Sequence, residues 1–262
     1  MKQIALDFLA LVKSLHDNPT ITVEEDYVLD SIKIKTEWSI TMGIEAAREF
    51  GNILLDESEI KFIEVSTISF LWTNRVKGKG FPALIYGGIQ MKGFAENLYG
   101  ESIFWDAVVH DTPPAEGLKS EFKKLGAFHK SSWGDDGTFG CFYREGKYPF
   151  PIYFFDNGNY YLMNMDLSEY YAAMIYNKAV VGWQYFYIQP EQIIQQLHKR
   201  KCAKWGLGLL QEVEGTRVDG VIELMNRLIL LFPDLFPDFE IRFYIEKRDE
   251  LVAAYNSFKN NL

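Results

Sequence analysis

The stretch that decides the fold is FPIYFFDNGNYYLM, residues 150–163. Two aromatic-rich runs flank Asn157-Gly158, a pair whose members both tolerate the positive φ angles that a two-residue turn requires. Aromatic and β-branched residues are also the ones that fit a pleated, half-buried strand. The stretch therefore predicts a β-hairpin with its tip at residues 156–159.

The residues after this hairpin predict a helix and then a closing strand. Asp166 and Ser168 carry side-chain oxygens that can accept the free amide hydrogens of a first helical turn, and the helix is expected to run through Tyr176. Residues 179–188 are again aromatic and end at Gln189-Pro190, which is typical of a strand. On that strand Trp183, Tyr185 and Tyr187 would share one face, because successive side chains point to opposite sides.

Upstream of the hairpin, the hydrophobic pattern predicts two helices and three strands. Apolar residues at helical spacing indicate helices over residues 3–16 and 43–55. Strands are expected at 31–38, 61–72 and 83–90. The Gly87-Gly88 pair lies inside the last strand pattern, where a bulge or a close approach of another backbone segment explains it better than a phosphate-binding loop.

Beyond Pro190 the chain favours helices. We expect them at residues 191–204, 217–232 and 247–259, with one more strand at 239–245. Because strands gather in the middle and helices at both ends, the fold class predicted is α+β, with an antiparallel or mixed central sheet flanked by helices. The expected organisation is a domain over residues 1–189 and a mostly helical C-terminal extension, 190–262, packed on it.

Composition indicates a globular protein with an acidic balance. Of the 262 residues, 48% are hydrophobic and 16% are aromatic, enough for a core without disulfide or metal support. The 36 acidic residues outnumber the 27 basic ones and give a formal charge of −9. Such a charge repels phosphate backbones, so nucleic-acid binding is not expected; attraction of a basic partner and simple solubility both stay open.

The sequence contains no signal for secretion, a membrane span or a disulfide framework. The two cysteines, Cys141 and Cys202, lie far apart and match neither a disulfide pattern nor a zinc spacing. The apolar run at residues 4–12 is interrupted by Asp7 and lacks a cleavage site, so we interpret it as a helix. No stretch approaches the roughly 18 apolar residues of a membrane helix, and a cytoplasmic protein is expected.

No motif for catalysis or for metal or cofactor binding is present. We therefore predict no catalytic residue, no metal ligand and no cofactor. The four histidines form no HExxH motif, and the glycines at 78–93 fit neither GxGxxG nor a P-loop. Asp156, Asn157 and Asn159 resemble the start of a calcium loop, but the downstream glutamate is missing. Any enzyme activity would require a site that the motifs do not reveal.

The aromatic residues are the remaining functional candidates. Tryptophan and tyrosine beside acidic groups make effective protein-binding surfaces, because they supply contact area at little entropic cost. The predicted partner-binding residues are Trp72, Trp105, Asp135, Asp136, Trp183, Tyr185 and Tyr187. Core packing is the competing interpretation for each aromatic side chain.

Residues 151–188 resemble the end of SUKH superfamily domains of the Smi/Knr type. Their sequence is PIYFFDNGNYYLMNMDLSEYYAAMIYNKAVVGWQYFYI. The resemblance rests on the Asp-Asn-Gly hairpin tip, on YYLMNMDLSEYY entering a helix and on GWQYFYI as a closing strand. It implies an α+β fold used for protein–protein binding, without a shared set of catalytic residues. Many bacterial members of that superfamily are immunity proteins that neutralise nuclease-type toxins, and others are regulatory scaffolds.

Three functions stay open at this point. The first is a binding module, most specifically an immunity-type inhibitor of a basic toxin, since an acidic protein can attract and cover a basic active site. The second is an enzyme with a pocket lined by Trp72, Tyr86, Trp105 and Trp183. The third is an oligomeric protein that buries the apolar stripe of residues 218–232 between chains; the sequence determines neither the partner nor the oligomeric state.

Overall fold

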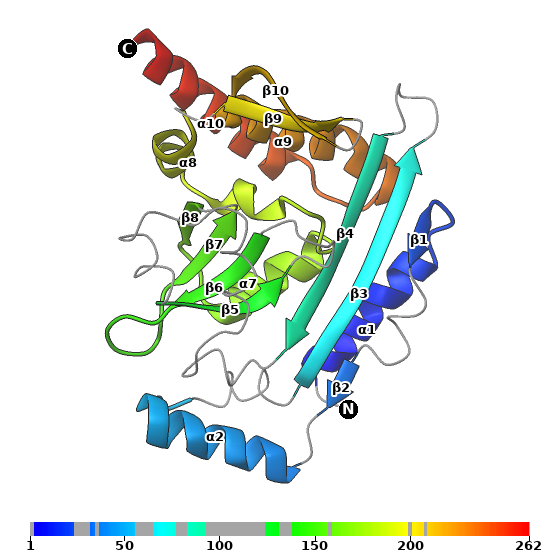
Figure 1. The fold of residues 1–262 in the computed structure, drawn as a ribbon. Helices are drawn as coiled ribbons and strands as arrows, with labels where there is room; N and C mark the ends of the chain where they lie inside the picture. The colour runs from blue at the N-terminus through cyan, green and yellow to red at the C-terminus, as the bar shows by residue number, and fades with distance from the viewer. Residues whose placement is uncertain are drawn as a thin grey trace. The chain divides into compact units, whose positions relative to one another are not determined.

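A computed structural model describes ten segments of the chain (Figure 1). They are residues 3–23, 32–34, 37–55, 65–76, 83–92, 124–130, 138–156, 159–198, 201–206 and 209–261. The chain divides into two compact units, Met1–Val181 and Gly182–Leu262, which are described separately. The division precedes the one expected at residue 190.

An antiparallel sheet forms the framework of the first unit. Within the described segments it has eight strands, and every pairing is antiparallel. Along the sheet the order is β1 (Ile21–Val23), β3 (Val65–Val76), β4 (Ala83–Lys92), β5 (Leu125–Lys130), β6 (Thr138–Tyr143), β7 (Ile152–Asp156) and β8 (Asn159–Met163), with β2 (Ile32–Ile34) also paired to β3. The predicted fold class, α+β with an antiparallel sheet, is confirmed.

Strands β7 and β8 form the predicted hairpin. Asp156 pairs with Asn159, which leaves two residues for the turn, and the side-chain Nδ2 of Asn159 donates to the Asp156 carbonyl oxygen at 3.0 Å. The turn residues, Asn157 and Gly158, are not among the described ones. This register determines which aromatic side chains share a face of the sheet, because neighbours on paired strands point the same way.

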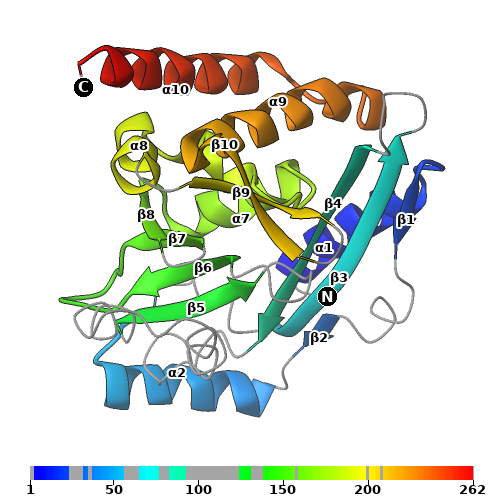
Figure 2. The ribbon, with the colours of Figure 1, turned by 45° about the horizontal axis from the view of Figure 1, so that its top comes forward.

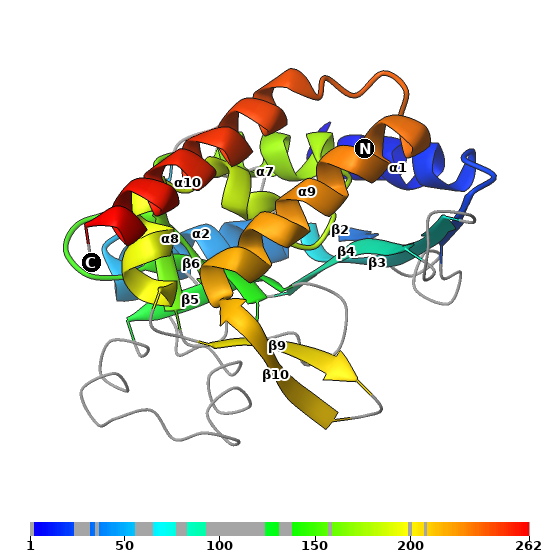
Figure 3. The same ribbon diagram turned by 90° about the horizontal axis from the view of Figure 1, so that it is seen from above.

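Helices α1 (Gln3–His16) and α7 (Leu167–Tyr176) cover one face of this sheet (Figure 3). The α1 helix buries Phe8, whose ring meets that of Tyr171 from α7 with centroids 6.2 Å apart. From the sheet, Phe128 meets Tyr170 at 5.1 Å. The α7 helix begins with the predicted cap: Asp166 accepts from the Glu169 amide and Glu169 accepts from the Asp166 amide, both at 2.8 Å.

The boundary between β2 and helix α2 (Glu37–Gly51) differs from the prediction. The sequence placed a strand over residues 31–38, but Trp38 lies in the first turn of the helix and is 72% exposed. Ile34 and Trp38 are four residues apart, a spacing that suits both the period of a strand and that of a helix. The alternation was therefore ambiguous, and the helix extends further toward the N-terminus than expected.

The segment after α7 is not the predicted strand. Lys178 and Ala179 have φ angles of 55° and 50°, and Gly182 has 87°, values that an extended strand does not contain. In place of the predicted strand there is an isolated β-bridge between Gly87 and Val180. The Gly88 amide donates to the Ala179 carbonyl oxygen at 2.9 Å, and the Val181 amide donates to the Tyr86 carbonyl oxygen at 3.1 Å. The predicted close backbone approach at Gly87-Gly88 is thus confirmed, and Ala179 belongs to the segment that makes it.

The second unit is mostly helical, as expected. It contains the 3-10 helix η2 (Trp183–Tyr187), helices α8 (Pro190–Leu197), α9 (Arg217–Leu235) and α10 (Arg242–Asn260), and the strands β9 (Lys201–Gly206) and β10 (Leu209–Thr216). The β9–β10 hairpin was not predicted; it begins where the helix of residues 191–204 was expected to continue. Figure 2 shows β10 leading directly into α9.

The predicted strand at residues 239–245 is wrong. Phe239 precedes α10 and Tyr244 lies in its first turn, where their rings meet at 4.7 Å. Phe239 also meets Phe232 of α9 at 4.7 Å, so this aromatic cluster buries Phe239 and Tyr244 without a sheet, while Ile241, Phe243 and Ile245 are only partly buried. Much of the apolar stripe of α9 is buried within this single chain, including Val221, whereas Ile222 and Ile229 are only partly buried.

None of the helices in the described part of the chain combines the length and the apolar character that crossing a membrane requires.

Candidate protein-binding surface

The predicted partner-binding residues do not form one exposed surface. Trp72 is fully buried, and its indole nitrogen donates to the Lys178 carbonyl oxygen at 2.7 Å. Trp183 and Tyr185 are buried and Tyr187 is partly buried, all on a 3-10 helix instead of a strand, so the expected common face does not exist. Trp105, Asp135 and Asp136 lie outside the described residues.

Two residues of the hypothetical aromatic pocket, Trp72 and Tyr86, do not lie on the same side of the sheet. Trp72 of β3 pairs with Gly87, and Tyr86 of β4 pairs with Thr73. Because consecutive strand residues alternate between faces, the side chains of Trp72 and Tyr86 point to opposite sides of the sheet. They cannot line one cavity.

The structure instead brings together three tyrosines that the sequence analysis did not single out. Tyr143 on β6, Tyr153 on β7 and Tyr160 on β8 form what we call the tyrosine row. The ring centroids of Tyr143 and Tyr153 are 5.4 Å apart, and those of Tyr153 and Tyr160 are 5.7 Å apart. All three side chains are partly buried.

Strand register produces this row. Tyr153 pairs with Cys141, two residues before Tyr143 on the same strand, and Tyr160 pairs with Phe155. All these side chains point to one face, and the tyrosines contact one another along the diagonals between paired positions. The row packs beside a fully buried cluster on the same face: Leu125, Ala127, Phe139, Cys141 and Phe155.

The two faces of these strands have different environments. Phe142 and Phe154 point to the face that α7 covers and are almost completely buried. On the other face, the tyrosine row keeps part of its surface accessible. Tyrosine suits such a position, because its ring can pack while its hydroxyl remains in contact with water or a partner.

Burial and the neighbouring Tyr160 phenol raise the pKa of the Tyr153 hydroxyl above its ordinary value. The hydroxyl therefore stays protonated at neutral pH and can donate as well as accept a hydrogen bond. The middle of the row offers an aromatic ring and a neutral polar group, and no negative charge.

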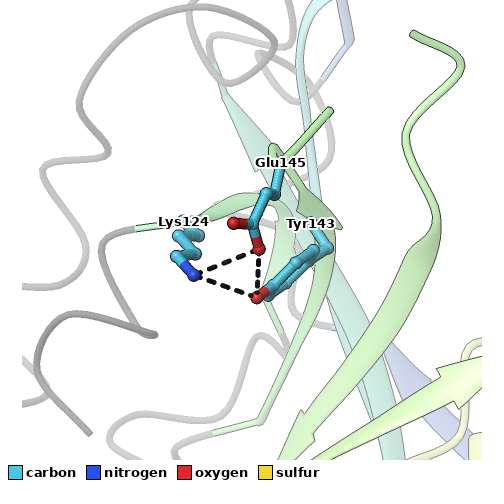
Figure 4. A network of polar contacts seen from close by, with 3 residues as sticks. All are labelled: Lys124, Tyr143 and Glu145. Carbon is cyan, nitrogen blue, oxygen red and sulfur yellow. Dashed lines mark hydrogen bonds and ion pairs between the residues drawn. The ribbon is translucent and has the colours of Figure 1, made fainter. Parts of the chain in front are cut away.

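A charged network lies at the Tyr143 end of the row (Figure 4). The Tyr143 hydroxyl donates to Glu145 Oε2 at 2.9 Å, and Lys124 Nζ lies 3.1 Å from the same oxygen. Lys124 Nζ is also 3.5 Å from the Tyr143 hydroxyl and 5.8 Å from the centroid of its ring. The Lys124 ammonium group thus lies beside both the Glu145 carboxylate and the Tyr143 side chain.

The acidic excess of the chain is confined almost entirely to the unit that carries this row. Met1–Val181 has 25 acidic and 17 basic residues, whereas Gly182–Leu262 has 11 and 10. A negative field around the first unit favours the approach of basic groups.

The buried ionisable groups of the sheet are not suited to bind or react at this surface. His129 is buried, with Nδ1 2.8 Å from the Tyr170 hydroxyl, and burial lowers its pKa from 6.5 to about 3. Burial raises the pKa of the Cys141 thiol, which disfavours the reactive thiolate. Within the described segments, no group of three or more His, Cys, Asp or Glu side chains could hold a metal ion.

Comparison of the chain with protein-family models, with curated proteins and with solved structures finds no match. The SUKH resemblance of residues 151–188 therefore stays a prediction. Its hairpin and capped helix have counterparts in the structure, whereas its closing strand is replaced by the bridge at Val180 and by η2.

Proposed function

We propose that this protein is a non-catalytic binding module that holds a basic partner protein against the tyrosine row and Glu145. The observation that carries the proposal is the row itself: three contacting, partly buried tyrosine rings on one sheet face, with a carboxylate at one end. Tyrosine supplies a large contact area with few rotatable bonds, and it is enriched among residues that dominate binding energies.

Charge supports the choice of a basic protein as partner. The acidic excess belongs to the unit that carries the row, so a basic protein would be steered toward this unit and a nucleic acid would be repelled. The resemblance of residues 151–188 to SUKH domains supports the narrower form of the proposal. In that form the protein is a cytoplasmic, immunity-type inhibitor of a basic toxin, or else a regulatory scaffold, and needs no cofactor.

The test is isothermal titration calorimetry of the full chain with candidate basic proteins, nuclease-type toxins first, at low and high salt. Wild type should bind one to one and more weakly at high salt, because screening reduces the attraction between exposed charges. Tyr153→Ala should raise Kd about 30-fold, the effect of losing a central interface aromatic worth about 2 kcal/mol.

Tyr176→Ala provides the matched control. Tyr176 is 44% exposed on α7, which covers the opposite face of the sheet, so its Kd should stay within about twofold of wild type. Circular dichroism establishes that both variants are folded. An equal loss of affinity in both variants, or an unchanged Kd for folded Tyr153→Ala, would contradict the proposal.

A further inference from the structure

The cation site at the end of the tyrosine row is occupied by a residue of the chain itself. Glu145 Oε2 accepts from the Tyr143 hydroxyl and lies 3.1 Å from Lys124 Nζ. The ammonium group also lies 5.8 Å from the centroid of the Tyr143 ring, at its hydroxyl edge. A carboxylate beside an aromatic face is the arrangement that binds organic cations, and here the cation is supplied internally.

The ion pair between Lys124 and Glu145 is open to solvent. The side chain of Lys124 is 32% exposed and that of Glu145 is 57% exposed, so water competes for both ends of the ion pair. The distance of 5.8 Å is close to the outer limit of about 6 Å for a cation–π contact. The ammonium therefore leaves much of the available attraction of the ring unused.

The side-chain contact is also not what joins the two segments. The Arg144 amide donates to the Lys124 carbonyl oxygen at 2.7 Å, and Leu125 pairs with Tyr143 on the neighbouring strands. These backbone contacts hold β5 against the end of β6 whatever the position of the lysine side chain. The side chain can leave Glu145 without separating the strands.

A guanidinium group fits the same site better than an ammonium group does. It is planar, so it can stack on a tyrosine ring, and its parallel N–H donors match a carboxylate in two-point fashion. The Tyr143 hydroxyl bonds to the carboxylate and the Tyr153 ring lies 5.4 Å from that of Tyr143, so the row offers aromatic surface to such a plane.

We propose that Lys124 is an internal stand-in for an arginine of the partner, which displaces the ammonium from Glu145 and stacks on the tyrosine row. This inference rests on the proposed function and specifies its chemistry: the partner inserts an arginine side chain, and Lys124 lowers the affinity by competing for the site.

The experiment is an NMR titration of the full chain with the synthetic peptide acetyl-Gly-Arg-Gly-amide and with its lysine and citrulline counterparts. Citrulline has the shape of arginine without the charge. The arginine peptide should perturb resonances of Tyr143, Tyr153 and Glu145 and should bind more tightly than the lysine peptide. The citrulline peptide should cause no comparable change.

Two substitutions at position 124 should act in opposite directions. Lys124→Met keeps the length of the stem and removes the competing cation, so the arginine peptide should bind up to about fivefold more tightly, the largest factor expected from an exposed ion pair. Lys124→Arg supplies a better internal competitor and should weaken binding below the wild-type level. Glu145→Gln should abolish it.

Equal affinities of the two position-124 variants for the arginine peptide would overturn the inference, as would perturbations remote from Glu145. This failure differs from that of the proposed function. If Tyr153→Ala weakens the partner protein complex while the position-124 variants bind the peptide alike, the row is a binding surface and the arginine displacement is wrong.

Discussion

Gly87→Ala probes the close backbone approach between β4 and the segment that follows α7. A Cβ atom built on Gly87 would lie 2.6 Å from the Ala179 carbonyl oxygen and 2.7 Å from the Cε2 and Nε1 atoms of the Trp72 indole. Ordinary Cβ contacts begin near 3.4 Å, so both neighbours would have to move by several tenths of an ångström. Neither can do so freely, since one is backbone and the other a fully buried ring.

The free energy of unfolding should fall by about 3 kcal/mol. Overpacking of a well-filled core costs about 1–3 kcal/mol. The same displacement weakens the hydrogen bond from Gly88 to Ala179 (2.9 Å) and the one from Trp72 to Lys178 (2.7 Å). Each of these contributes about 1 kcal/mol net. The sum of these losses lies at the upper end of single-residue effects.

Urea unfolding followed by circular dichroism measures this change. Gly146→Ala is the matched control: Gly146 has a φ of 90°, and nothing lies within 4 Å of its added Cβ. The free energy of unfolding of Gly146→Ala should fall by only about 1–2 kcal/mol, because alanine is strained in the left-handed backbone conformation. A Gly87→Ala variant within about 0.5 kcal/mol of wild type, or no more destabilised than the control, would refute the close approach.

Two further stability predictions follow from single side chains. The unfolded state binds a proton at His129 below pH 6.5, whereas the folded state does so only near pH 3; stability should thus fall by about 2 kcal/mol between pH 8 and pH 5 in urea titrations. His129→Gln should reduce that slope, and an unchanged slope would show that His129 is not its source. Asp166→Ala removes the cap of α7 and should lower the free energy of unfolding by about 1 kcal/mol in thermal unfolding. Ser168→Ala, which lies outside the capping box, should leave it unchanged. Equal midpoints for the two variants would argue against the cap.

Local sequence signals predicted the hairpin and the capped helix because each depends on a few adjacent residues. Asn157-Gly158 determines a turn length, and with it the pairing of Asp156 with Asn159. Asp166 and Glu169 have the spacing of a capping box and form one. Neither feature needs a distant contact to be specified.

Strands β5 and β6 escaped prediction because they are buried on both faces. In LGAFHK, Leu125–Lys130, the first five residues are all buried, and in Thr138–Tyr143 the four central ones are. Such strands lack the alternation of polar and apolar residues on which a period of two depends.

The role of an aromatic residue depended on contacts that sequence patterns do not encode. Trp72 is buried because a segment more than a hundred residues later supplies the Lys178 carbonyl oxygen to its indole nitrogen. The tyrosine row had a partial signal: a two-residue turn in the hairpin places Tyr160 opposite Phe155, and hence next to Tyr153. Tyr143 had no such signal, because its strand was not predicted.

The partly buried tyrosines and their fully buried neighbours on this sheet face separate binding from stability. The fully buried side chains are at most 2% exposed, among them Phe139, Cys141 and Phe155, and they hold the strands together. The tyrosines pack beside them and lose less contact with the core when truncated, since part of each ring is already accessible. A partner that covers the row would gain the burial that the fold leaves incomplete. Changes in the row should therefore affect binding more than folding, whereas changes in the buried cluster should affect both.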